Sequence, residues 1–224
     1  MAEALKNQEE SRIILPNASW GTYERLLAER EERRYPRFFY DRGVLEILSP
    51  SAEHDRISRL IAALVELLAE EADADIENAG STTFKREDLS RGFEPDECFY
   101  FGSNAGRVRE LVADKGDIEL DAGDPVPDLV VEVDITRPSL DKLPIYARLD
   151  VPEVWRYSSG RLNIFKRANE TLAGEDPGYA PTPESDLLPG ATGDVLTRFV
   201  AEGLSLDRRL WRRGVREWAR DQGH

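Results

Sequence analysis

The run LVVEVDI at residues 129–135 limits the possible folds more than any other stretch of this chain. Its apolar composition is typical of a β-strand that is covered on both faces. Strands of this kind occur in sheets with helices packed against them. The sequence therefore predicts an α/β protein.

Patterns on either side of this strand agree with that fold class. Amphipathic spacing predicts helices at residues 20–34, after the capping sequence Ser49-Pro50-Ser51, at 140–150, and from Asp194 to about Arg220. Extended runs predict hairpins at 37–48 and 151–167 and strands at 81–87 and 95–101, with a short helix near 107–112 and a loop at 169–189. We expect a polar N-terminal segment (1–19), one domain (20–190) and a C-terminal helical tail (191–224).

Composition narrows the range of functions that this chain can have. With 30 basic and 44 acidic residues the formal charge is −14, which argues against a wide phosphate-binding surface but allows a small catalytic cleft. The single cysteine, Cys98, and the two histidines, His54 and His224, exclude an intrachain disulfide, a cysteine zinc site and a histidine metal cage. No leader-like or membrane-length apolar run is present, so we expect a cytoplasmic protein.

The strongest strand carries carboxylates on one face. Alternation places Glu132 and Asp134 on the face opposite Val131 and Val133. Because burying an ionised carboxylate costs several kcal/mol unless it is paired or metal-bound, this face should either open into a cleft or meet a positive partner.

An earlier predicted strand offers a second carboxylate, Asp96, which could meet Glu132 if the two strands are neighbours. These two side chains and the backbone carbonyl of Val133 would form an all-oxygen site suited to Mg²⁺ or Mn²⁺. Lys142 could then orient a nucleophile and stabilise developing charge. The alternative is that Glu132 is a buried carboxylate satisfied by an arginine or by backbone amides, and that Lys142 is a solvated helix residue.

Four segments carry a resemblance to a known family: GVLEILSPSAEHDRI, GFEPDECFYF, PDLVVEVDITRPSLDK and YARLDVPEVWRY. From about Trp20 to Phe165 the chain resembles the Uma2 family (DUF820) of the PD-(D/E)XK nuclease superfamily. The resemblance implies a restriction-endonuclease-like mixed β-sheet flanked by helices. It also implies a Mg²⁺- or Mn²⁺-dependent endonuclease, and we expect the nucleic acid to be DNA and the protein to be a homodimer.

Carried over to this sequence, the resemblance implies that Asp96 is the first metal ligand, Glu132 the second and Lys142 the catalytic lysine. It also implies that Glu53, at the start of the long helix, lies near the site. The superfamily has its lysine two residues after the second acidic ligand, where this chain has Asp134. Asp134 would either pair with Lys142 or join the metal ligands.

The C-terminal stretch DRRLWRRGVREWARDQ, residues 207–222, holds six arginines around Trp211, Val215 and Trp218. It could contact phosphates, but the favoured interpretation is a helix that docks its tryptophans on the protein body or on a second subunit, with its arginines paired to acidic groups. Two alternatives to a nuclease also stay open: a nuclease-like binding or assembly module without catalysis, and a hydrolase of a smaller phosphate ester.

Overall fold

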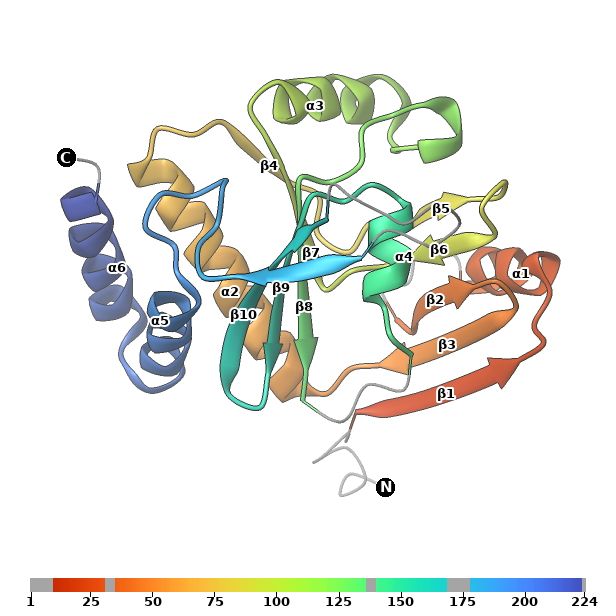
Figure 1. The fold of residues 1–224 in the computed structure, drawn as a ribbon, viewed down its shortest axis with the longest axis horizontal. Coiled ribbons are helices and arrows are strands. Elements are labelled where there is room, and N and C mark those ends of the chain that lie inside the picture. The colour runs from red at the N-terminus through yellow and green to blue at the C-terminus, as the bar shows by residue number, and fades with distance from the viewer. Residues whose placement is uncertain (1–9, 31–34, 136–139, 169–177, 223–224) are drawn as a thin grey trace.

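The computed structural model describes residues 10–30, 35–135, 140–168 and 178–222, which form two β-sheets and six α-helices (Figure 1). The five-stranded sheet is antiparallel and has the order β1 (Ser11–Pro16), β3 (Val44–Ser49), β2 (Arg37–Asp41), β6 (Arg91–Phe93), β5 (Phe84–Arg86). The six-stranded sheet has the order β11 (Tyr179–Thr182), β10 (Arg161–Arg167), β9 (Glu153–Ser158), β8 (Leu129–Asp134), β7 (Glu97–Phe101), β4 (Ile76–Asn78). It is mixed, because β8 and β9 are parallel while the other pairs are antiparallel. The predicted α/β class and mixed sheet are confirmed.

Strand β8 has a different apolar core on each face, as its sequence predicts. Leu129, Val131 and Val133 belong to the core shared with α2 (Ala52–Glu71), and Val130 belongs to the core on the other face. That second core also contains residues of the five-stranded sheet and of α4 (Leu143–Arg148). The carboxylate-bearing face of β8 therefore points toward α4 and the five-stranded sheet.

Helix α2 begins where its sequence predicts, with Ser51 accepting a hydrogen bond from the backbone N–H of His54. Its apolar side packs on the six-stranded sheet, and the two C-terminal helices, α5 (Gly193–Ser205) and α6 (Arg208–Gln222), lie on the far side of α2 from the five-stranded sheet (Figure 1). Trp211 of α6 is buried and donates its indole N–H to the carbonyl of Phe199 at 2.8 Å. Docking of the C-terminal tryptophan-bearing helix is thus observed.

Several boundaries differ from the sequence-based predictions. The helix expected at 20–34 is described only as α1 (Trp20–Arg30), since 31–34 lie outside the described residues. The polar region 102–125 contains a longer helix than expected, α3 (Ser103–Lys115), followed by a short 3-10 turn (Leu120–Ala122). The predicted loop 169–189 contains strand β11, and the C-terminal tail is two helices. In the part of the chain that the structure describes, no helix has both the length and the apolarity to cross a membrane.

Three strands had no clear signal in the sequence: β1, β4 and β6. Strand β1 lies in the expected polar N-terminal segment and pairs with β3 along its full length, from Ser11 opposite Ser49 to Pro16 opposite Val44. Glu10, the residue before β1, contacts His54, and Arg12 of β1 lies near Asp134. Residues 11–16 of the expected N-terminal segment are therefore part of the five-stranded sheet.

Candidate functional site

The pairing of β7 with β8 brings Asp96 and Glu132 together. Glu97 lies opposite Val131 in this antiparallel pair, so one further step of the register places Asp96 opposite Glu132. Directly opposed residues of antiparallel strands project from the same face of the sheet. Both side chains are buried, Asp96 with 0% and Glu132 with 3% of its surface exposed.

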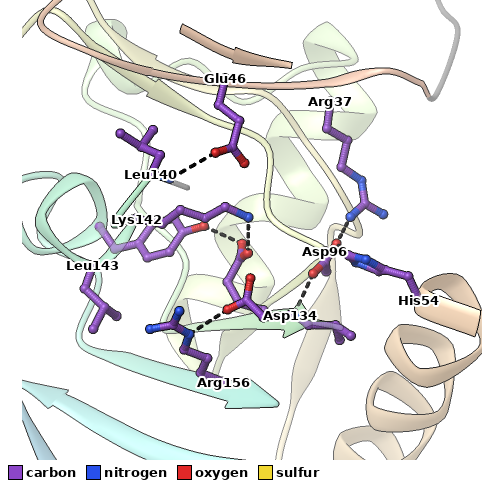
Figure 2. Close-up of polar contacts among 12 residues, drawn as sticks. Arg37, Glu46, His54, Asp96, Asp134, Leu140, Lys142, Leu143 and Arg156 are labelled. Carbon is purple, nitrogen blue, oxygen red and sulfur yellow. Dashed lines mark hydrogen bonds and ion pairs between the residues drawn. The ribbon is translucent and has the colours of Figure 1, made fainter. Parts of the chain in front are cut away.

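Both carboxylate oxygens of Asp96 have partners from distant parts of the sequence (Figure 2). Oδ1 lies 2.7 Å from Nε2 of His54 and forms an ion pair with Arg37. Oδ2 accepts a hydrogen bond from the backbone N–H of Val133 at 2.6 Å. The other ring nitrogen of His54 lies 2.7 Å from Glu10, so this buried histidine bridges two carboxylates.

Glu132 is held by two side chains of the α4 region. Lys142, the residue before α4, donates from Nζ to Oε2 at 2.5 Å, and the hydroxyl of Tyr146 donates to Oε1. The two donors are four positions apart, which places them on one side of a helical turn. Burial, and after it the charge of Glu132, raises the pKa of Tyr146 well above its ordinary value, so the hydroxyl keeps its proton for this hydrogen bond. Lys142 also lies over the ring of Phe39, 3.7 Å from its centroid.

Asp134 pairs with a different cation. Its Oδ2 accepts from Nε of Arg156 at 2.6 Å, and Oδ1 lies 3.8 Å from Arg12 of β1. Arg12 also lies 3.5 Å from Glu46 of β3, which accepts a hydrogen bond from the backbone N–H of Leu140 at 3.2 Å. Lys142 is thus bonded to Glu132 rather than to Asp134, and the carboxylate face of β8 meets positive partners.

The structure brings together four of the residues singled out in the sequence: Asp96, Glu132, Asp134 and Lys142. Val133 takes part through its backbone N–H. Glu53 is exposed, and within the described residues no hydrogen bond or ion pair links it to this group. His54, its neighbour in α2, contacts Asp96 instead.

Sequence reasoning missed five partners of these carboxylates: Arg12, Arg37, His54, Tyr146 and Arg156. His54 had a weak signal, because its helical phase with Ile57 and Ile61 pointed it toward the sheet. Tyr146 had another, since it stands four residues after Lys142 on a predicted helix. Arg37 and Arg156 lie on predicted strands with nothing in the local pattern to connect them to Asp96 or Asp134.

A small cavity lies beside Glu132, with a volume of about 10 Å³, which is near the minimum that holds one water molecule. Its polar lining comes from Glu132, Asp134, Lys142, Tyr146 and Arg156. A substrate group larger than water can enter only if these side chains rearrange.

The donor set has the chemistry that Mg²⁺ and Mn²⁺ prefer, because it consists of carboxylate and carbonyl oxygens. Among the described residues, however, no group of three or more His, Cys, Asp or Glu is arranged to hold a metal ion. Asp96 and Glu132 each have protein donors on both oxygens. A metal would therefore bind in exchange for Arg37, Lys142 or another of these partners.

Comparison with known proteins gives one family. The sequence model of Uma2, described as "Putative restriction endonuclease", matches residues 20–197, which is more than half of the chain. A solved structure described as a putative nuclease belonging to DUF820, from Anabaena variabilis, is similar at 11% sequence identity with a TM-score of 0.43, over 90% of this chain and 98% of that chain. No curated protein matches. With the family pattern spanning both carboxylate strands and the lysine, this chain belongs to the Uma2 family.

Proposed function

We propose that this protein is a nuclease that hydrolyses phosphodiester bonds in DNA with the help of Mg²⁺ or Mn²⁺. The observation that carries the proposal is the pairing of Asp96 with Glu132 across β7 and β8, with Lys142 bonded to Glu132. Two buried carboxylates can hold a divalent cation. The cation and the nearby lysine would together supply the positive charge that hydrolysis of a phosphodiester needs. The family description of a restriction endonuclease supports the same reaction class.

Asp96, Glu132 and the carbonyl of Val133 would hold the metal, which supplies a Lewis acid and a water of lowered pKa when bound. Lys142 stands next to these ligands, so its ammonium group can stabilise negative charge on the phosphate. Tyr146 acts on the carboxylate alone: its hydroxyl fixes the orientation of Glu132. Asp134 and Glu53 are accessory candidates, Asp134 because it neighbours Lys142 in the same cavity.

Plasmid cleavage tests this proposal. Supercoiled plasmid is incubated with wild-type protein and Mg²⁺ or Mn²⁺, and relaxed and linear products are measured on gels. We expect cleavage that EDTA abolishes and that Glu132→Gln or Lys142→Met lowers by at least roughly a hundredfold, as is typical when a group that stabilises transition-state charge is lost.

The matched control is Glu97→Gln. Glu97 is also a buried carboxylate, adjacent to Asp96 in the chain, but its side chain accepts from Ser58 of α2 on the opposite face of the sheet. Its loss should leave cleavage near the wild-type rate in the folded fraction. Cleavage that survives Glu132→Gln unchanged would show that the site is wrong or that a contaminant cuts the plasmid.

The paired carboxylates favour one alternative function, a nuclease-like binding or assembly module without catalysis. Arg37 and Lys142 already neutralise Asp96 and Glu132, so the fold does not need a metal for charge balance. Calorimetric titration with Mn²⁺ separates the two functions. Binding that Asp96→Asn abolishes supports the nuclease, and a wild-type protein without binding supports the module.

A further inference from the structure

Four arginines that form no ion pair with the described residues gather where α2 meets α6. Arg56 and Arg59 lie one turn apart on α2, and Arg208 and Arg212 lie one turn apart on α6. In the part of the chain that the structure describes, none of the four has a carboxylate oxygen within 4.0 Å. We call these four residues the α2–α6 arginine surface.

Other arginines of α6 behave differently. Arg216 donates to Glu70 at 2.7 Å, and Arg220 donates to Glu71 at 2.7 Å, so both attach α6 to the end of α2. They account for the docking expected of this helix. The arginines of the α2–α6 surface form no such ion pair between α6 and α2.

Arg208 lies close enough to Arg212 and Arg56 to be influenced by their charges. Arg208 lies over the ring of Trp211 at 4.3 Å, and its pKa is lowered by burial and then by the charges of Arg212 and Arg56. Arg56 donates to the carbonyl of Leu204, which ties α2 to the end of α5 without reducing the charge. Repulsion of this kind is relieved when an anion binds.

A hollow of about 540 Å³ lies along this surface and is lined by Arg56, Arg59 and Arg208 together with Asp55 and apolar residues. Asp55 accepts a hydrogen bond from the hydroxyl of Tyr35 at 2.6 Å. The same helix connects the surface to the candidate site, because His54, two residues before Arg56, contacts Asp96. The first turns of α2 therefore present one side to the site and the other side to the arginine surface.

We propose that the α2–α6 arginine surface binds the phosphate backbone of a polynucleotide whose neighbouring part enters the candidate site. On a chain of charge −14, a group of arginines without carboxylates at ion-pair distance among the described residues is complementary to a polyanion. The proposal deepens the proposed nuclease function and rests on it only for the identity of the substrate. The arginines would position the nucleic acid through its phosphates, and contacts to phosphates do not distinguish one base sequence from another.

The test is the salt dependence of binding to a fluorescently labelled DNA duplex, measured by anisotropy in EDTA so that no cleavage occurs. Four phosphate contacts predict that log K falls with log salt at a slope of roughly −3.6. Arg56→Gln/Arg59→Gln and Arg208→Gln/Arg212→Gln should each bring the slope to roughly −1.8, since each removes two contacts.

Arg86→Gln/Arg109→Gln is the matched control, because it removes the same charge from β5 and α3, away from α6 (Figure 1). Its slope should equal that of the wild type. The proposal is overturned if the wild type does not bind the duplex. It is also overturned if the control makes the slope as shallow as the two test variants do. If the slopes follow the prediction but plasmid cleavage fails, the arginine surface stands and the nuclease function is wrong.

Discussion

The candidate site and the α2–α6 arginine surface neutralise charge in opposite ways. In the site, the buried carboxylates of Asp96, Glu132 and Asp134 each have a cationic side chain from another part of the chain. On the surface, four arginines have no carboxylate partner among the described residues. Within the described residues, every one of these carboxylates forms an ion pair, whereas none of the four arginines does.

The difference has a physical cause. A buried charge loses its hydration, so it needs a partner in the folded protein, whereas an exposed charge keeps its water and counterions. Site residues should therefore affect stability strongly, and surface arginines should affect binding far more than stability.

Arg37→Met should produce the largest loss of stability. Arg37 is fully buried against Asp96, and its removal leaves that carboxylate with only His54 and the N–H of Val133. Breaking a buried ion pair on one side costs about 3 kcal/mol or more of unfolding free energy. Urea denaturation measures the loss.

A double-mutant cycle makes this prediction specific. Arg37→Met in an Asp96→Asn background should cost much less, because no stranded carboxylate remains. Arg56→Met is the control, since Arg56 is an exposed arginine that forms no ion pair with any carboxylate the structure describes. Equal losses for Arg37→Met and Arg56→Met would show that the buried pair does not set the stability of the site.

Tyr146→Phe should have a smaller effect on stability. The variant keeps the ring and removes only the hydroxyl that donates to Glu132, and a hydrogen bond to a charged group contributes about 1.5–3 kcal/mol. Tyr100→Phe is the matched control, because the Tyr100 hydroxyl donates to the uncharged carbonyl of Pro125 and its loss should cost only about 1 kcal/mol. Thermal and urea unfolding of both variants decide the order, and a reversed order would contradict the role given to Tyr146.

The local part of the site could be predicted from the sequence. Alternation along the run 129–135 distinguishes its two faces, so Glu132 and Asp134 could be placed on one face. The start of an earlier predicted strand, Pro95-Asp96, suggested a partner. The start of the long helix could be predicted, because the capping sequence Ser49-Pro50-Ser51 stands in front of a regular apolar pattern, and Ser51 is the residue that caps the helix.

The cationic half of the site could not be predicted, because it depends on topology. Arg37 reaches Asp96 only because β2 belongs to a second sheet that faces β8, and Arg12 reaches Asp134 only because β1 adds to the edge of that sheet. Strand β1 has apolar residues at consecutive positions, so its period gave no signal. Short strands such as β4 and β6, of three residues each, form through their neighbours rather than through their own propensity.

Arg208→Gln/Arg212→Gln should have the smallest effect on stability, although it should weaken DNA binding clearly. Neither arginine forms an ion pair with the described residues, so the unfolding free energy should change by no more than about 0.5 kcal/mol. Adding salt should stabilise the wild type more than the variant, because salt screens the repulsion that Arg208 experiences from Arg212 and Arg56. Urea midpoints at low and high salt measure both effects. A loss well above 1 kcal/mol would mean that these arginines hold α6 in place, and the contrast with the paired carboxylates of the site would then fail.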